Sequence, residues 1–300
     1  MKKKIYLFAL MAMVLTLGSC SDNENGIGGE TSKYITVSTS IGNMTRVATD
    51  ANGGQTFEEG DEISVYAWTG APTVAPETRE RVVNNAINKL TNGSWVSTPQ
   101  MLWKNNRDKH YFIGVYPISA ISDLSAGEYT FDVNKQTESD LLVAVNPDGL
   151  SYSADAQQTV PLTFTHVMAK LAVKLTYKNQ WGGIPTVEKV VVGNAAKEAT
   201  INYLTKVVTP STTAKEDFSL PEITENTKYV SVIIPQEDVK QLTIVIGGKN
   251  FVYDNGTPFK LESGKITTVN LEVGRDEIKL GDVKITDWED GSTFSGEALN

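Results

Sequence analysis

The side chains from which a catalytic or metal site would be built occur in few useful patterns in this chain. The two histidines, His110 and His166, are far apart in the sequence, and each lies in a run typical of a strand. There is no H-E-x-x-H zinc motif, no other paired spacing of metal ligands and no G-x-S-x-G nucleophile motif. We therefore expect a protein that is not an enzyme, with no catalytic residue, no metal and no cofactor.

The nearest approach to an ion site is the loop that begins at Asp50. Asp50, Asn52 and Gly54, with Asp61 at the twelfth position, supply some of the oxygen ligands of a calcium loop. The sixth position is Gln55, where the turn requires glycine, and the twelfth is an aspartate, where a bidentate glutamate is expected. A solvated turn leading into a strand explains the same residues.

Tryptophan side chains offer another kind of chemistry, because their rings can stack on sugars. The chain has five tryptophans: Trp68, Trp95, Trp103, Trp181 and Trp288. Packing in cores and against sheets is the more frequent use of this side chain. A glycan-binding role through exposed tryptophans therefore stays as an alternative function.

The only cysteine, Cys20, follows a segment with a distinct composition. Lys2, Lys3 and Lys4 form a basic head, residues 5–17 are mostly apolar, and Leu-Gly-Ser precedes the cysteine. This is the pattern of a secretory signal, and the apolar run is too short for a membrane span, which needs ~20 residues. The ending resembles a bacterial lipobox, in which the signal is removed and Cys20 becomes the acylated N-terminus. An ordinary secretory signal that happens to contain a cysteine is the alternative.

The charge of the chain beyond that signal argues against a nucleic-acid partner. From residue 20 onward, 24 Lys and Arg stand against 36 Asp and Glu, a net charge of −12. Such an acidic surface repels phosphate backbones, and the sequence contains no basic stripe that would offset the repulsion.

The elements that carry these residues are predicted to be short strands. The chain contains 32 Thr and 29 Val, and β-branched residues favour strands. Apolar and polar residues alternate in short runs bounded by Gly, Asn, Asp and Pro. Strands are expected at 34–41, 62–68, 110–116, 141–145, 171–177, 187–192, 242–246, 250–253, 266–273 and 283–288.

Two local features add detail to this pattern. Gly247 and Gly248 separate two strand-like runs and supply the positive φ of a tight hairpin. The segment 77–90 is the one helix-like piece, although a loop with a single turn of helix fits it equally well. Regularly spaced strands without intervening helices favour antiparallel β-sandwiches of ~100 residues each. A chain of 300 residues fits two in tandem, with a boundary near His166.

Several segments, taken in their order, resemble the fimbrillin family, the type V pilins of Gram-negative anaerobes. The similarity spans nearly the whole chain. The matching segments are 17–20, 44–46, 57–68, 111–117, 162–171 and 285–288. The resemblance implies an all-β fold of two tandem transthyretin-like antiparallel β-sandwich domains. It also implies a lipoprotein precursor that polymerises after a surface protease removes an N-terminal strand.

The strand that would be removed is 34–41. Ile35, Val37, Thr39 and Ile41 share one face and would fill a hydrophobic groove in the first sandwich. An ordinary edge strand would show the same alternation.

The expected cleavage site follows this strand in a small, polar segment suited to an exposed loop. Arg46 is the only arginine between Cys20 and Arg79. An arginine-specific surface protease, as the resemblance implies, would cut after Arg46 and leave Val47 as the new N-terminus. Arg46 as a plain surface arginine is the alternative.

The C-terminal part is the candidate donor strand for the next subunit. Ile278, Leu280, Val283 and Ile285 have suitable alternation for strand addition, whereas residues 289–300 are too polar to fill a groove.

The sequence thus predicts a structural subunit of a cell-surface fimbria that supports adhesion. Its partners would be other pilin subunits, an arginine-specific protease and, before cleavage, the outer membrane through acylated Cys20. We expect five parts: a lipoprotein signal peptide at 1–19, a flexible tether at 20–33, a removable strand with its cleavage loop at 34–46, an N-terminal β-sandwich at 47–165, and a C-terminal β-sandwich with the candidate donor strand at 166–300.

Overall fold

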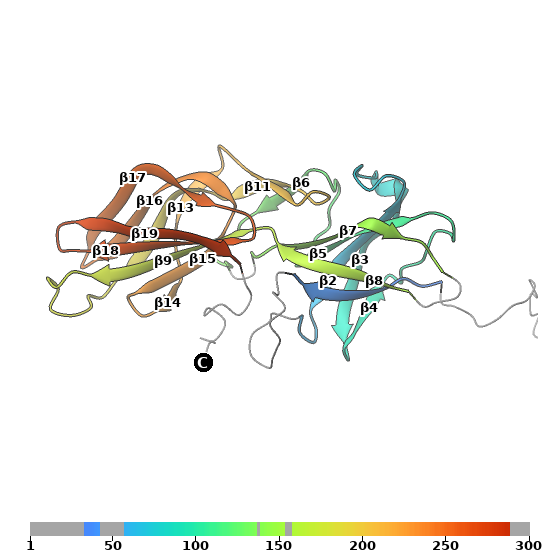
Figure 1. The fold of residues 1–300 in the computed structure, drawn as a ribbon, viewed down its shortest axis with the longest axis horizontal. Coiled ribbons are helices and arrows are strands. Elements are labelled where there is room, and N and C mark those ends of the chain that lie inside the picture. The colour runs from blue at the N-terminus through green and yellow to red at the C-terminus, as the bar shows by residue number, and fades with distance from the viewer. Residues whose placement is uncertain (1–32, 43–56, 137–138, 154–157, 289–300) are drawn as a thin grey trace, which may run out of the picture. The chain divides into compact units, whose positions relative to one another are not determined.

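Strands form nearly all the regular structure of the chain, as the composition predicts. The computed structural model describes residues 33–42, 57–136, 139–153 and 158–288 (Figure 1). All of these belong to one unit, residues 32–300. The predicted all-β class is confirmed, and the predicted domain boundary near His166 stays a prediction. Within the described ranges, no helix is long and apolar enough to cross a membrane.

The first sheet has seven strands and contains the predicted removable strand at one edge. Figure 1 shows that strand in blue. In spatial order the strands are β1 (Thr36–Ile41), β8 (Thr159–His166), β7 (Leu142–Leu150), β5 (His110–Tyr116), β2 (Glu62–Thr69), β3 (Arg81–Thr91) and β4 (Ser94–Thr98).

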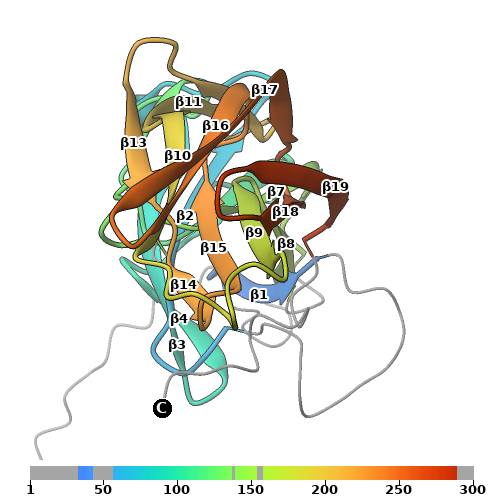
Figure 2. The ribbon, with the colours of Figure 1, turned by 90° about the vertical axis from the view of Figure 1, so that its left-hand side faces the viewer.

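Three further sheets follow along the chain. The four-stranded sheet contains β13 (Lys215–Ser219), β10 (Lys189–Ala196), β16 (Gln236–Ile246) and β17 (Lys249–Leu261). The five-stranded sheet contains β14 (Glu222–Thr224), β15 (Lys228–Ile233), β9 (Ala169–Tyr177), β18 (Lys265–Val273) and β19 (Ile278–Asp287). These two sheets share one hydrophobic core, as in a sandwich (Figure 2). A small sheet joins β12 (Val207–Pro210), β11 (Glu198–Asn202) and β6 (Gly127–Thr130).

Strand direction is the feature that alternation did not reveal. Most ladders are antiparallel, as predicted, but β1 runs parallel to β8, and β18 runs parallel to β9. A period of two places side chains on faces and is the same for either direction. The predicted hairpin is confirmed: Ile246 pairs with Lys249, and Gly247 and Gly248 have φ values of 58° and 70°.

The helix-like interpretation of 77–90 is wrong beyond its first turn. A short 3-10 turn covers Thr78–Glu80, and strand β3 then pairs with β2 and β4. Asn85 has a φ of 56°, and the ladder with β2 is irregular there. The irregularity separates buried Val83 from buried Ala86 by three residues, a spacing that imitates one turn of helix.

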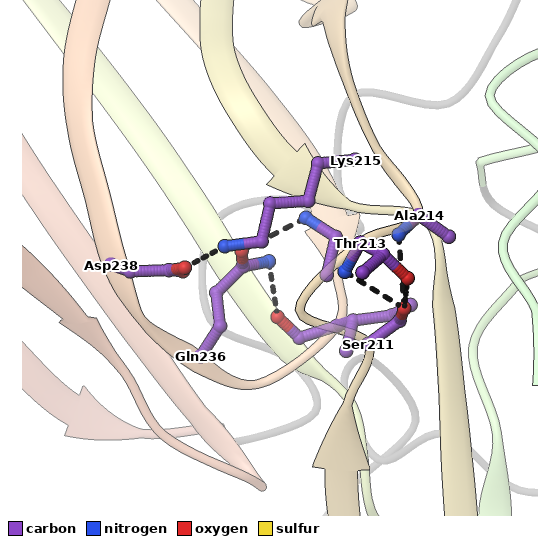
Figure 3. A network of polar contacts seen from close by, with 8 residues as sticks. Ser211, Thr213, Ala214, Lys215, Gln236 and Asp238 are labelled. Atoms are coloured by element: carbon purple, nitrogen blue, oxygen red, sulfur yellow. Dashed lines mark hydrogen bonds and ion pairs between the residues drawn. The ribbon is translucent and has the colours of Figure 1, made fainter.

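A polar network fixes the end of β10 against β13 and β16 (Figure 3). Buried Gln236 accepts a hydrogen bond from the Ala196 backbone N–H at 2.9 Å and donates one to the Ile234 carbonyl at 2.9 Å. Lys215 of β13 forms an ion pair with Asp238 of β16. These contacts satisfy polar groups beside the irregular ladder between β10 and β13, so their role is structural.

The seven-stranded sheet contributes side chains to two cores. Along β2, Ile63, Val65 and Ala67 belong to a core that also contains side chains of β1. The intervening Tyr66 and Trp68 belong to the larger core of the sandwich. Because both faces of β2 are buried, close packing fixes the side chains on each face, including those that share a core with β1.

Gly114 lies where β8 side chains reach across to β5. A Cβ at this position would stand 2.6 Å from Phe164 Cζ and 3.1 Å from Leu162 Cδ1. We expect Gly114→Ala to destabilise the protein by about 1–3 kcal/mol, because an overpacked core must shift its neighbours. The urea midpoint measures this loss. Ser38→Ala, at an exposed site, is the control, and an unchanged midpoint for Gly114→Ala would contradict the packing described.

Candidate functional site

The inner face of β1 completes a hydrophobic core. Ile35 is 2% exposed and Val37 is 5% exposed, while Thr39 and Ile41 are partly buried and Ser38 is exposed. The structure thus places the four residues of the predicted inner face on one side. Their core also contains Val160, Leu162 and Phe164 of β8 and Phe112 of β5. β1 therefore fills a groove, which we call the β1 groove.

The backbone is bonded on both sides where residues 33–35 lead into β1. On one side, residues 36–41 pair in parallel with residues 159–164 of β8. On the other side, the Ile35 N–H donates to the Met101 carbonyl at 2.9 Å, and the Trp103 N–H donates to the Lys33 carbonyl at 3.2 Å. The β1 groove is therefore lined by hydrogen-bonding groups of the main chain as well as by apolar side chains.

Strand β8 depends on β1 for half of its length. β7 pairs with β8 through Phe164, Thr165 and His166 only. In the described part of the chain, residues 159–163 consequently have β1 as their strand partner and β7 does not reach them. Loss of β1 would leave their backbone groups unpaired, which is costly wherever water cannot replace the ladder.

A tryptophan closes the groove on the side opposite β8. Trp95 of β4 donates a hydrogen bond from Nε1 to Thr39 Oγ1 at 3.0 Å. β4 is the far edge of the seven-stranded sheet, so the sheet curls until its first and last strands meet at this contact. The sequence indicated that Trp95 would more often pack in a core or against a sheet than stack on a sugar. Its position in a strand that alternates polar and apolar residues did not reveal which strand it would face.

Outward-facing hydroxyls fix the register of β1 on β8. Thr36 Oγ1 lies 3.2 Å from Thr159 Oγ1, and the Ser40 hydroxyl donates to Thr163 Oγ1 at 3.2 Å. Cross-strand hydroxyl pairs of this kind contribute modestly to stability. They set the register at the surface, while the apolar residues set it in the core.

His110 supports the segment that borders β1. It is buried, its Nε2 accepts a hydrogen bond from the Lys104 N–H at 3.0 Å, and its Nδ1 lies 3.1 Å from the Asp108 carbonyl. The Trp103 ring packs edge-on against it at 5.0 Å. Burial lowers the pKa of His110, so the imidazole is neutral, with the proton on Nδ1. This histidine therefore holds residues 103–104 in place beside β1.

The candidate donor residues lie in their own sheet and not in a groove. β19 is an edge strand whose only ladder partner in the described part of the chain is β18. Ile278 and Leu280 are partly buried against the sandwich core, whereas Val283 and Ile285 are each 40% exposed. The free backbone edge of such a strand is a ready template for pairing with another chain, especially where apolar side chains accompany it.

An aromatic stack anchors the end of β19. Trp288 is 3% exposed, and its ring stacks on His166 with centroids 4.1 Å apart and planes 6° apart. Lys170 Nζ lies 4.0 Å from the centroid of the same Trp288 ring. His166 also contacts Asp140 through Nδ1 and Oδ2 at 2.8 Å. These contacts give His166 a structural role, which is to hold the end of β19 in place.

The tryptophans lie mostly inside the protein. Trp68 and Trp288 are buried, and the other three are partly buried. Trp68 and Trp103 line an open pocket of 740 Å³ with Arg79 and Lys104, but the Trp68 side chain is almost entirely covered. None of the five therefore offers a fully exposed ring to a sugar.

The remaining predicted sites fall elsewhere. Cys20, Arg46 and Val47 lie outside the described residues, as do residues 50–55 of the calcium-like loop. Within the described ranges, no group of three or more His, Cys, Asp or Glu side chains is placed to hold a metal ion.

Comparisons with known proteins agree with this architecture. The family model described as fimbrillin-like matches residues 45–288. A provisionally assigned cell adhesion protein of Bacteroides ovatus has a TM-score of 0.65 at 18% identity, covering 85% of this chain and 98% of that one. A similarly assigned protein of Bacteroides uniformis has a TM-score of 0.60 at 18% identity, covering 78% of this chain and 93% of that one. A fimbrial protein of Bacteroides vulgatus has a TM-score of 0.54 at 12% identity, covering 86% of this chain and 100% of that one. No curated protein matches the chain.

A charge placed on the inner face of β1 should undock the strand. Val37→Asp buries an unpaired carboxylate at a cost of about 3–5 kcal/mol, so we expect the amide hydrogens of residues 159–163, among which Pro161 has none, to exchange about 10²–10⁴-fold faster. Ser38→Asp, one residue along and facing outward, is the matched control. Exchange in β9 and β18 should be unchanged in both variants. Retained protection at 159–163 in Val37→Asp would show that β8 does not depend on β1.

Acid should destabilise the segment beside β1 that His110 holds in place. Because the folded-state pKa is lowered, the unfolded chain binds the proton first as pH falls below about 6.5. The stabilisation that neutral His110 provides is fully present above about pH 6.5. It is lost as the pH falls from there toward the lowered pKa of the folded state. We expect the unfolding free energy of the wild type to fall between pH 7 and pH 5 relative to that of His110→Gln, measured by urea titration. Parallel curves for the two proteins would contradict this assignment.

Proposed function

Because the chain belongs to the fimbrillin-like family, we propose that it is a structural subunit of a cell-surface fimbria that assembles by strand exchange. The observation that carries the proposal is the position of β1. This strand completes a core, forms the edge of its sheet and pairs with residues 159–163 of β8, which β7 does not reach in the part of the chain that the structure describes. A strand placed in this way can be exchanged for one of similar pattern, because another extended segment with matching side chains can make the same backbone and core contacts.

The precursor is a lipoprotein in this proposal. The signal pattern of residues 1–19 leads to export, and acylated Cys20 anchors the chain to the outer membrane. The polar residues 20–33 form a tether between the lipid and β1. In this state β1 occupies the groove of its own chain and blocks assembly.

Cleavage after Arg46 converts the closed precursor into an acceptor. Arg46 lies beyond the C-terminal end of β1, so a cut there separates β1 from the rest of the chain and leaves Val47 as the new N-terminus. The released strand is then held by non-covalent contacts alone. It leaves with the lipid, since the tether connects the two.

The acceptor exposes a defined set of groups once β1 has left. Burial of Ile35 and Val37 is lost, each contributing about 1.5–3 kcal/mol. Residues 159–163, the Met101 carbonyl and Trp95 Nε1 lose their partners on β1. A strand from a neighbouring subunit satisfies all of them together. The C-terminal segment with Ile278, Leu280, Val283 and Ile285 is the proposed donor.

The tryptophan arrangement supplies no comparable support for a glycan-binding function. Binding by stacking requires an accessible ring face, and the five rings are buried or partly buried. We therefore propose no glycan-binding function.

Blocking the cleavage should block assembly. Arg46→Ala removes the arginine between Cys20 and Arg79, so we expect a folded, lipidated monomer on the cell surface and no filaments by electron microscopy. N-terminal sequencing of the wild-type protein from cells should give Val47. Arg79→Ala, at an exposed arginine of the 3-10 turn, is the matched control and should form filaments normally. Filaments of wild-type length in Arg46→Ala would refute the cleavage-gated assembly.

A further inference from the structure

The β1 groove imposes three requirements on any strand that replaces β1. Two alternate apolar residues must take the places of Ile35 and Val37, which are the most deeply buried positions. The residue two places further on must accept a hydrogen bond, because Trp95 Nε1 points at Thr39 Oγ1. The strand must also be regular, since the ladder between β1 and β8 runs from Thr36 to Ile41 without a bulge.

Strand β19 meets these requirements in one stretch. Val283 and Ile285 are alternate apolar residues that their own subunit leaves 40% exposed. Asp287, two places after Ile285, carries carboxylate acceptors and forms an ion pair with Lys265 at the exposed surface. The ladder of β19 with β18 is regular from Val283 to Asp287 and shifts register only before Val283.

We propose that β19 of one subunit enters the β1 groove of the next in a single register. Val283 replaces Ile35, Ile285 replaces Val37, and Asp287 replaces Thr39 and accepts the hydrogen bond of Trp95. The donor runs in the direction of β1, parallel to β8. This register rests on the strand exchange proposed above and specifies the partner as a second copy of this chain.

Two other alignments of β19 fit the β1 groove less well. With Ile278 and Leu280 in the buried positions, the donor withdraws two side chains that pack against its own core. That alignment also places the irregular part of β19, around Gly281 and Asp282, in the regular ladder of the groove. Reversing the donor, with Ile285 in place of Ile35, puts Gly281 opposite Trp95 and leaves the indole N–H without an acceptor.

On exchange, β19 loses one set of backbone and side-chain contacts and gains another set of the same kind. The donor gives up its ladder with β18 and the stack of Trp288 on His166, and it gains a ladder with β8 and a hydrophobic groove. The Trp288 anchor therefore opposes release of β19 in the free subunit. Trp95 is a specificity-determining residue, because it selects a strand with an acceptor at the third inward position.

Disulfide trapping tests the register directly. In the proposed alignment Lys284 takes the place of Thr36 and lies beside Thr159 of the next subunit. We would use the full chain with Cys20→Ser, carrying Lys284→Cys and Thr159→Cys, and treat it with an arginine-specific protease before oxidation. Paired residues of neighbouring strands lie within the Cα distance that a disulfide spans. A ladder of covalent dimers and longer oligomers on a non-reducing gel is expected.

Two matched variants complete the experiment. Thr36→Cys with Thr159→Cys in the uncleaved chain is the positive control, because those hydroxyls are 3.2 Å apart, and it should form a disulfide within one chain. Lys279→Cys with Thr159→Cys reports the alternative alignment and should give no covalent oligomers.

The outcomes separate the register from the assembly mechanism. Filaments with covalent oligomers from the Lys284 pair support the proposal. Filaments in which the Lys279 pair cross-links instead, or in which neither pair does, overturn the register and leave strand exchange standing. If the cleaved chain with Cys20→Ser alone forms no oligomers by electron microscopy, the proposed function fails, and the register fails with it.

Discussion

The parallel ladder between β1 and β8 is the interaction on which the first half of the molecule depends. It supplies the strand partner of residues 159–163, and it brings Ile35 and Val37 into the core. It also allows β1 to meet Trp95 of β4, so that the curled sheet closes on itself. Residues 35–41, near the N-terminal end of the described chain, therefore control whether this core is closed to water.

The larger core contains no β1 residue, although β2 contributes side chains to both cores. It includes side chains from β9, β10, β16 and β18. Cooperative units of a protein can open separately when they share few contacts. Loss of β1 is thus expected to open one core while the sandwich that carries β19 keeps its structure. A subunit in this state presents an empty groove and a folded platform for its own donor strand.

Exposed strand edges are hazardous, and the structure limits the hazard at β19. Val283 and Ile285 are partly exposed there, but lysines and acidic residues alternate with them along the strand. Charged side chains on an edge strand discourage indiscriminate pairing. The stack of Trp288 on His166 adds a specific anchor at the end of the same strand. The edge is therefore available to a partner with a matching groove and is poorly suited to others.

The sequence by itself determined the all-β class, most strands and the inward face of β1, because a period of two in residues such as Ile35 and Val37 is a local property. It misjudged residues 81–90, since the irregularity at Asn85 gives buried side chains a helical spacing. Tertiary structure alone decided that β1 runs parallel to β8, that Trp95 faces Thr39 and that β7 pairs with β8 only from Phe164 onward within the described residues. These are relations between segments more than 50 residues apart, and alternation within one strand carries no information about which strand lies beside it.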